Sequence, residues 1–291
     1  MAWIQFIFDS SPDAAEDLSD KLSECGASAV TFEDNADQPI FEPAIGSTPL
    51  WSATRVIALF SADIDIDGTI GLLSNLMAPA AVPEYRVEAV EDKDWEREWM
   101  DNFHPICFGE QLWICPSWHT PPQADAINIM LDPGLAFGTG THPTTALCLN
   151  WLDQADVKDK YVIDYGCGSG ILAIAAALLG AKKVIGVDID PQALEATQAN
   201  AERNGVKIDT YFPDECPLDP ADLLIANILA GPLQSLSELF SNLTKPHANL
   251  VLSGILEEQA QDVSSSYQTW FAMQPATQKE EWIRLNGQRH D

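Results

Sequence analysis

The sequence predicts an α/β protein whose larger part is a parallel sheet covered by helices, preceded by a small α+β domain. Three observations lead to this prediction. Residues 161–180 show a buried strand, a turn with three glycines and an apolar helix. From there strand and helix patterns alternate as far as residue 267, which is typical of a parallel sheet. Residues 1–90 instead show the order β-α-β-β-α-β, the ferredoxin-like arrangement.

Each element of the first 90 residues has its own signal. Short apolar or alternating runs predict strands at residues 3–8, 27–32, 54–60 and 82–90. Helical spacing predicts two helices: residues 12–25, which stop at Gly26, and residues 67–77, which stop before Pro79. Because this region contains no set of catalytic residues, we interpret it as a substrate-recognition domain. A purely structural role is the alternative.

Residues 91–108 are predicted to be a linker helix between the small domain (1–90) and a large domain (109–291). This segment is rich in charge and carries Trp95 and Trp99 four positions apart, a spacing that places both side chains on one helix face. In the large domain the predicted strands are 111–115, 126–131, 161–163, 183–187, 207–212, 222–226 and 248–253, with a final pair at 269–273 and 281–286. The predicted helices are 144–152, 171–179, 191–204, 233–243 and 257–267.

The glycine turn is the strongest candidate for a ligand site. Gly166, Gly168 and Gly170 follow Asp164 at alternate positions, so a ligand can approach the backbone and the N–H groups at the start of the next helix. The dinucleotide fingerprint G-x-G-x-x-G would require a glycine where this chain has Ile171. Asp188 ends the next strand, 22 residues after Gly166, where an acid can meet ribose hydroxyls.

This combination of a glycine turn and a strand-end acid resembles the S-adenosylmethionine site of class I methyltransferases, which have a Rossmann-like sheet. The resemblance implies that the turn lies against the amino acid part of the cofactor and that Asp188 binds the ribose. A nicotinamide cofactor is the alternative that the pattern leaves open. A merely structural turn is less favoured, because three glycines in five residues cost backbone entropy.

Residues 132–145 form a second candidate segment, rich in glycine and threonine, that leads into a helix opened by Pro143. Such a segment delivers N–H groups and hydroxyls to a polar ligand. We therefore expect the segment, with Phe137 and Thr141, to contact the cofactor; an elaborate helix cap is the alternative. His142 is a candidate catalytic base, although a structural role at the start of the helix is the alternative.

Asn227 is the candidate residue for orienting the substrate. It follows the strand at 222–226, and ligands of open α/β sheets bind beyond the carboxyl ends of the strands, so Asn227 is expected beside the glycine turn and Asp188. Methyltransferases that act on planar nitrogens usually carry Asn-Pro-Pro-Tyr here. This chain has Asn-Ile-Leu-Ala, and Ala230 cannot stack on a ring, which favours an aliphatic amine as the target. The alternative is that Asn227 only caps a helix.

Over its whole length the chain resembles the bacterial ribosomal protein L-eleven methyltransferase family. The resemblance is carried by residues 132–145, 164–170, 188–191, 227–232 and 279–282. It implies methyl transfer from S-adenosylmethionine to the lysine ε-amines and the N-terminal α-amine of that ribosomal protein, with cofactor residues at Thr145, Gly166, Asp188 and Asn227. The alternatives are a methyltransferase for a small molecule, for RNA or for another protein amine, and a non-catalytic cofactor-binding module.

The composition limits the partners. The chain has 44 acidic and 15 basic residues, a net charge of −29, which repels phosphate backbones and predicts no direct nucleic acid binding. This charge favours a basic partner or a salt-adapted surface. The six cysteines form no C-x-x-C pair and no cluster with histidine, so we expect no metal site and a reduced compartment. With no leader-like N-terminus and no long apolar run, a cytoplasmic protein without membrane contact is expected.

Overall fold

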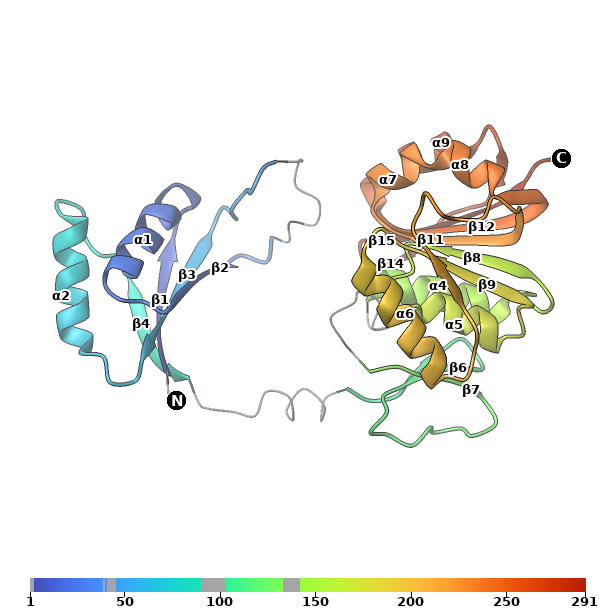
Figure 1. Ribbon diagram of the computed structural model, residues 1–291. Helices are drawn as coiled ribbons and strands as arrows, with labels where there is room; N and C mark the ends of the chain where they lie inside the picture. The colour runs from blue at the N-terminus through green and yellow to red at the C-terminus, as the bar shows by residue number, and fades with distance from the viewer. Residues whose placement is uncertain (1–2, 39, 41–45, 91–102, 133–141) are drawn as a thin grey trace. The chain divides into compact units, whose positions relative to one another are not determined.

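The computed structural model divides into two compact units, Met1–Met100 and Asp101–Asp291, which we describe separately (Figure 1). The structure describes residues 3–38, 40, 46–90, 103–132 and 142–291. Within these ranges, none of the helices combines the length and the apolar character needed to cross a bilayer.

The first unit is a four-stranded antiparallel sheet with two helices. Its strands follow the order β2-β3-β1-β4, and every neighbouring pair is antiparallel. The predicted β-α-β-β-α-β order is confirmed, with the bounds β1 (Trp3–Ser10), α1 (Pro12–Glu24), β2 (Ala29–Asp34), β3 (Thr54–Ser61), α2 (Ile66–Met77) and β4 (Tyr85–Val90).

Both helices of this unit lie on one face of its sheet (Figure 1). The strands alternate, so one set of side chains, including Phe6, Phe8 and Phe60, is fully buried against the helices. Helix α1 starts with proline in its first turn, and α2 is capped by Asp65, whose side chain accepts a hydrogen bond from Gly68 N at 3.2 Å. The opposite face of the sheet carries the alternate residues of each strand.

The second unit is built on the predicted parallel sheet, with strand order β10-β9-β8-β11-β12-β15-β13. The first five strands are parallel to one another, whereas β15 runs antiparallel to both its neighbours, so the predicted final strand pair is confirmed. A short strand, β14, also pairs with β15 and was not predicted. The bounds are β8 (Tyr161–Tyr165), β9 (Lys183–Val187), β10 (Asp209–Tyr211), β11 (Ala221–Asn227), β12 (Thr244–Leu256), β13 (Phe271–Met273), β14 (Thr277–Lys279) and β15 (Trp282–Arg289).

Helices cover both faces of this sheet (Figure 1). On one face lie α4 (Pro143–Gln154), α5 (Ile171–Leu178) and α6 (Pro191–Arg203). On the other lie α7 (Ala230–Ser235), α8 (Ser237–Asn242) and α9 (Ala260–Tyr267), the last preceded by the short helical turn η1 (Glu257–Gln259). The single helix predicted at 233–243 is wrong in its details: the helical segment begins at Ala230 and is interrupted at Leu236.

A separate three-stranded sheet precedes the large one: β5 (Ile106–Phe108), β6 (Leu112–Cys115) and β7 (Ile127–Met130). The prediction of a linker helix over 91–108 is wrong for its last three residues, which form β5. Residues 91–102, with Trp95 and Trp99, lie outside the described part of the chain. The prediction failed at these residues because β5 depends on tertiary contacts: it pairs antiparallel with β6 and buries Phe108. A strand of three residues is too short to give a recognisable pattern in the sequence.

Asp153 joins this small sheet to α4. Its side chain is almost completely buried and accepts three backbone hydrogen bonds, from Glu110 N at 2.7 Å and from Gln111 N and Leu112 N at 3.1 Å each. The Asp153 carboxylate on α4 thus accepts the hydrogen bonds of the backbone N–H groups at the turn between β5 and β6. The N–H of Leu112 is buried and would be costly to leave without an acceptor, so this contact fixes the small sheet on α4.

We predict that Asp153→Ala lowers the free energy of unfolding of the protein by about 1–3 kcal/mol, because three backbone donors, among them the N–H of buried Leu112, lose their acceptor together. Urea denaturation followed by circular dichroism measures the effect. The matched control is Asp156→Ala, three residues on and exposed, which should change stability by less than about 0.5 kcal/mol. Equal effects of the two substitutions would contradict this role of Asp153.

Candidate active site

The sequence-predicted residues of the glycine turn, Asp188 and Asn227 meet at one edge of the large sheet. The turn follows β8, Asp188 follows β9, and Asn227 is the last residue of β11. Since β8 lies between β9 and β11 and all three are parallel, their carboxyl ends share this edge. Ligands of open α/β sheets bind at such an edge, so the fold brings these candidates together.

The backbone of the turn requires glycine. Gly166, Gly168 and Gly170 have φ values of 82°, 53° and 80°, the region that side chains disfavour. Space is also lacking: a Cβ atom on Gly166 would lie 2.2 Å from Ile228 Cγ2, and one on Gly170 would lie 2.9 Å from the Thr197 side chain. The turn is therefore both folded back and closely packed.

Two neighbouring elements hold the turn in place. Val187 O, at the end of β9, accepts hydrogen bonds from Gly166 N at 2.7 Å and Cys167 N at 3.0 Å. From α6, Thr197 Oγ1 donates to Gly168 O at 3.0 Å, and Asn200 Nδ2 donates to Ser169 O at 2.9 Å. Sequence reasoning missed Thr197 and Asn200. The available signal was two polar residues three apart on α6, with Thr197 on the side that faces the sheet and fully buried.

Asp188 is fixed by the backbone on both oxygens. Its Oδ2 accepts from Gly168 N at 2.9 Å, and its Oδ1 accepts from Asp190 N at 3.0 Å. A carboxylate has about four acceptor positions, so each oxygen retains capacity for a hydroxyl group of a ligand. Ile189, the next residue, is an apolar side chain that is 81% exposed, and sequence reasoning did not single it out.

Asn227 is held on one side only. Its Nδ2 donates to Thr145 Oγ1 at 3.4 Å, and Thr145 is fully buried near the start of α4. Its Oδ1 is buried and has no hydrogen-bond partner within the described residues. A buried acceptor without a donor is costly, so this oxygen fits a bound molecule that brings an N–H or O–H group.

Gly254 supports the Asn227 turn from β12 and was not predicted. It has a φ of 84° and sits at an irregularity in the pairing of β12 with β15, between Leu252 and Ile255. A Cβ atom here would lie 2.3 Å from the carbonyl oxygen of Ile228, the residue after Asn227. The backbone of β12 thus approaches the turn that follows its neighbour β11, and only glycine permits this.

His142 occupies the N-cap of α4. Its Nδ1 lies 2.7 Å from Thr144 Oγ1 and accepts a hydrogen bond from Thr144 N at 3.4 Å, and its ring meets that of Trp282 edge-on at 4.9 Å. Burial lowers the pKa of His142, although Glu281 and Glu280 act in the opposite direction. A neutral ring that caps a helix accounts for these contacts, and the catalytic role of His142 stays a prediction.

The segment before His142 is only partly described. Phe137 and Thr141, both expected to contact the cofactor, lie outside the described residues. The segment's first residue, Asp132, is anchored: it accepts from Ser117 N at 2.7 Å and pairs with Arg203 of α6 at 2.9 Å. In the part of the chain that the structure describes, no group of three or more His, Cys, Asp or Glu side chains could hold a metal ion.

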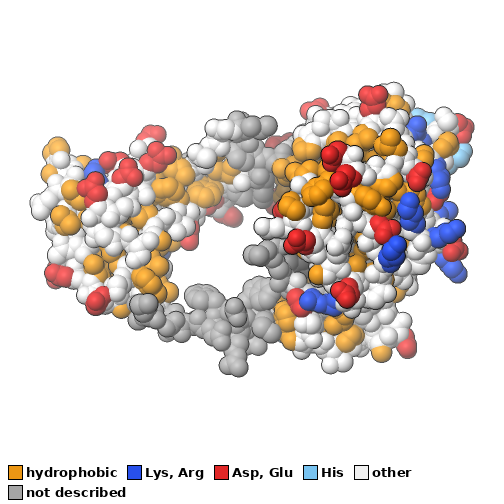
Figure 2. All heavy atoms as spheres, viewed as in Figure 1, with side chains coloured by type: hydrophobic (Ala, Val, Ile, Leu, Met, Phe, Trp, Pro, Cys, Tyr) orange, Lys and Arg blue, Asp and Glu red, His pale blue; other side chains and the backbone are white. Residues whose placement is uncertain are grey.

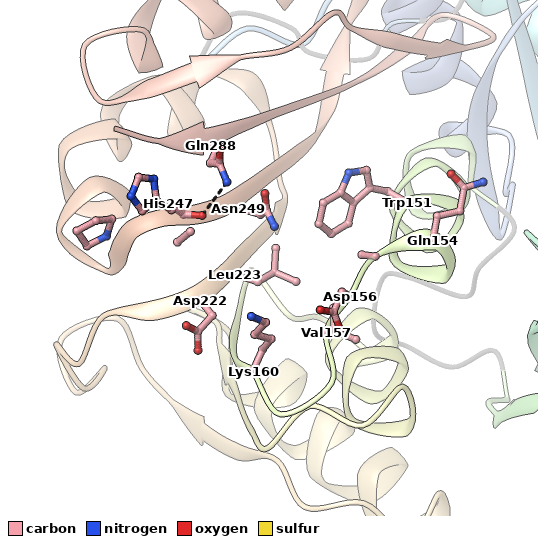
Figure 3. A pocket seen from close by; sticks show the side chains of 13 residues that line it. Trp151, Gln154, Asp156, Val157, Lys160, Asp222, Leu223, His247, Asn249 and Gln288 are labelled. Carbon is pink, nitrogen blue, oxygen red and sulfur yellow. Dashed lines mark hydrogen bonds between the residues drawn. The ribbon is translucent and has the colours of Figure 1, made fainter. Parts of the chain in front are cut away.

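A separate hollow of about 560 Å³ lies at the opposite, amino-terminal edge of the large sheet. Figure 3 shows side chains from several elements around it, among them Trp151 of α4, Lys160 before β8 and Asn249 of β12. Asp222 in its wall is paired with Lys245 at 2.9 Å. None of the sequence-predicted site residues lines this hollow.

Comparison with known proteins decides the family. The model of the family described as ribosomal protein L11 methyltransferase (PrmA) matches residues 2–290. The chain belongs to this family. Ribosomal protein L11 methyltransferases of Shewanella sp. (strain ANA-3) and Shewanella baltica (strain OS195) are each 56% identical to it over 292 residues, which cover 99% of this chain and all of theirs.

A crystal structure of a ribosomal protein L11 methylase from Lactobacillus delbrueckii subsp. bulgaricus is also similar. It is 35% identical to this chain with a TM-score of 0.59, and the match covers 65% of this chain and 100% of that one. Family membership confirms the resemblance drawn from the sequence, the Rossmann-like class I methyltransferase fold and S-adenosylmethionine as the methyl donor. The glycine turn, the fixed Asp188 carboxylate and the free Asn227 oxygen fit this cofactor, which has a polar amino acid end and ribose hydroxyls.

We predict that Gly254→Ala lowers the affinity for S-adenosylmethionine at least about tenfold, equivalent to about 1.4 kcal/mol, because the Ile228 backbone and with it Asn227 must move. The matched control is Gly231→Ala, since a Cβ atom there meets nothing within 4 Å. Titration calorimetry measures affinity, and thermal unfolding shows whether each variant is folded. Unchanged affinity in a folded Gly254→Ala variant would mean that the contact does not position the site.

Proposed function

We propose that this protein transfers methyl groups from S-adenosylmethionine to the lysine ε-amines and the N-terminal α-amine of ribosomal protein L11. The observation that carries the choice of an amine is the buried Oδ1 of Asn227 beside the glycine turn, which has no hydrogen-bond partner in the described part of the chain. This oxygen can accept an N–H of the target. Ile228, Leu229 and Ala230 follow it, and since none of them has a ring to stack on a planar group, an aliphatic amine fits better. Family membership supports the same substrate.

The residues divide the work of the reaction. The cofactor supplies a methyl group on a sulfonium, which is already electrophilic. We propose that the glycine turn and Asp188 hold the cofactor, with Thr145 fixing the Asn227 amide. When Asn227 Oδ1 accepts one N–H of the amine, the nitrogen lone pair can be aimed at the methyl carbon. Such positioning contributes a large part of the rate.

The amine must also be neutral to react. Deprotonating a lysine of ordinary pKa, about 10.4, costs roughly 4–5 kcal/mol at pH 7. Removing the ammonium from water and placing it beside another cation both lower its pKa. His142 could assist only through Nε2, because its Nδ1 is occupied by Thr144. We therefore propose positioning and desolvation as the main contributions, with His142 as a residue to test.

We propose that the first unit grips the ribosomal protein with the open face of its sheet. The side chains of this face alternate with those packed against the helices; they include Gln5, Ile57, Leu59, Arg86 and Glu88, together with Ile7, which is buried. Ile57 and Leu59 are half-buried apolar residues at the centre of β3, and Gln5 and Arg86 both bond to Glu88 beside them. An apolar centre with a polar margin is typical of a protein-binding surface.

The charge is distributed in a way that suits a basic substrate. Seven of the 15 basic residues lie at the amino-terminal edge of the large sheet, away from the site: Lys158, Lys160, Lys182, Lys183, Lys207, Lys245 and Arg289. Figure 2 shows basic side chains gathered on one side of this unit. The acidic residues Glu280 and Glu281 stand at the β14–β15 turn, next to Trp282, whose ring meets that of His142. Free ribosomal protein would therefore be drawn toward the site. We propose that the enzyme works in the cytoplasm on this free protein, without direct contact to nucleic acid or membranes.

The direct test is to incubate the protein with S-adenosylmethionine labelled in the methyl group and purified ribosomal protein L11, and to locate the label by mass spectrometry. We expect label on lysines and the N-terminus, and loss of it in Asp188→Ala, which removes the acceptor of the ribose hydroxyls. His142→Asn keeps an N-cap residue, so a retained rate would assign His142 to capping alone. Label only on RNA or on a small amine would overturn the proposal.

The open sheet face is tested by Leu59→Ser. We predict at least about a tenfold increase in KM for ribosomal protein L11, because an apolar contact at the centre of the face is lost, with affinity for S-adenosylmethionine unchanged. Leu72→Ser on α2 is the matched control, since Leu72 is exposed on the helical side of the same unit. An equal KM in the two variants would assign the face no part in recognition.

The acidic surface predicts a salt effect on the free substrate. We expect kcat/KM to fall as salt rises while kcat changes little, because salt screens attraction over about 8 Å at physiological strength. Replacing Glu280 and Glu281 by Gln should reduce this dependence. Replacing Asp156 and Asp159 by Asn, at the amino-terminal edge, should reduce it less. Initial rates on free protein and on ribosomes decide: a rate indifferent to salt, or a preference for ribosomes, would leave the acidity without a steering role.

A further inference from the structure

Asp164, near the end of β8, is a buried carboxyl group beside the cofactor site that the proposed mechanism does not use. It is 1% exposed. Its Oδ2 accepts a hydrogen bond from Ala173 N, in the first turn of α5, at 3.0 Å. The N-cap of that helix is Gly170, which has no side chain to accept this bond, so Asp164 replaces it from β8. Its Oδ1 has no hydrogen-bond partner among the described residues.

The surroundings of Asp164 disfavour a negative charge. Across the described ranges no Lys, Arg or His forms an ion pair with it, and its charged neighbour, Asp188, has the same sign. The two nearby thiols bring no positive charge: burial raises the pKa of Cys148 in α4 to about 12 and raises that of Cys167 in the turn. Burial raises the pKa of Asp164 to about 8; the bond from Ala173 N opposes this shift and Asp188 adds to it.

The expected ligand changes this balance. S-adenosylmethionine carries a sulfonium and an ammonium against one carboxylate, so its net charge is positive. Asp164 stands two positions before Gly166 and is close enough to Cys167 of the turn to raise the pKa of that thiol, and the turn is where the amino acid part of the cofactor is expected. A cation placed close to a buried carboxyl group favours its ionised form.

We propose that Asp164 is a proton-linked charge partner of the cofactor, neutral in the free protein and ionised in the complex with S-adenosylmethionine. On binding, the O–H bond of the carboxyl group breaks, the proton passes to water, and the electron pair stays on the carboxylate opposite the positive ligand. This inference rests on the proposed function only in that S-adenosylmethionine is the ligand.

This linkage between proton release and binding lets the site discriminate between the cofactor and the product. After methyl transfer the sulfonium is a neutral thioether, so S-adenosylhomocysteine has no net positive charge to keep Asp164 ionised. The carboxyl group then regains its proton and the attraction ends. Affinity for S-adenosylmethionine should therefore rise more with pH than affinity for the product. For each unit by which the cofactor lowers the pKa of Asp164, the affinity gain is about tenfold.

The first test needs no ligand. Asp164→Asn keeps an acceptor for Ala173 N but cannot ionise. In the wild type the folded-state pKa lies above the unfolded value of about 3.9, so folding takes up a proton between these two values and stability falls as pH rises through this window. The Tm of Asp164→Asn should thus rise relative to wild type from pH 5 to pH 8 and level off above it. A Tm difference independent of pH would overturn the proposal.

The second test counts protons. Titration calorimetry with S-adenosylmethionine at pH 7, in two buffers of different ionisation heat, gives the protons released on binding. Wild type should release more than Asp164→Asn, and the excess should shrink with S-adenosylhomocysteine. Subtracting the protons released with Asp164→Asn from those released with wild type removes the contribution of the cofactor's own ammonium. Cys148→Ala, which alters a neighbouring buried thiol, should release as many protons as wild type.

The outcomes separate the two proposals. Equal proton release by wild type and Asp164→Asn overturns the role of Asp164, while absence of any binding heat in wild type overturns the proposed function instead. If Asp164→Asn does not fold, infrared difference spectra of the wild type suffice: the C=O band of a protonated carboxyl group should disappear when S-adenosylmethionine is added. A band that persists in the complex contradicts the proposal.

Discussion

The place of β8 between β9 and β11 is the constraint on which the site depends. Val162 and Ile163 of β8 are fully buried, one in the core on each face of the sheet, so this strand is fixed from both sides. Parallel neighbours require crossover helices, and these are α5 and α6. The same helices then serve the turn: α5 supplies the N–H groups at its start, and α6 supplies the two side chains that bind the turn carbonyls. Burial of one strand thereby sets the positions of several candidate ligand-binding groups.

The groups that we propose to meet the ligand are already held in place by contacts within the protein. Two backbone N–H groups orient the Asp188 carboxylate, and Thr145 and Gly254 set the position of Asn227. Holding Asn227 in place before the ligand binds has a cost. Its buried Oδ1 lowers the stability of the free protein by about 1–3 kcal/mol while no described residue donates a hydrogen bond to it. In the proposed function an amine that donates an N–H to this oxygen recovers this free energy, which would favour the correct substrate.

The sequence predicted those parts of the candidate site whose positions depend on neighbouring residues in the chain. The glycine turn, Asp188 and Asn227 could be found because each follows a buried strand directly, and parallel strands end at a common edge. Thr197 and Gly254 could not, because their roles arise from contacts across the fold: one reaches the turn from a helix, the other permits the Ile228 backbone to approach. Likewise β5 depends on pairing with β6, which a three-residue pattern does not reveal.

Attracting a basic substrate favours acidic residues, whereas methylating its amine disfavours a carboxylate next to that amine. In the structure the surface carboxylates and the groups around Asn227 are separate. In the proposed function, carboxylates at the surface would attract a basic protein, but a carboxylate in contact with the target amine would hold it as an unreactive ammonium. The side chain expected beside the amine is therefore a neutral amide, Asn227. The Asp188 carboxylate is turned to backbone N–H groups, and Asp164, which has no ion-pair partner among the described residues, is buried. A protein of charge −29 can thus attract a cation and still offer it a site in which losing a proton is not opposed.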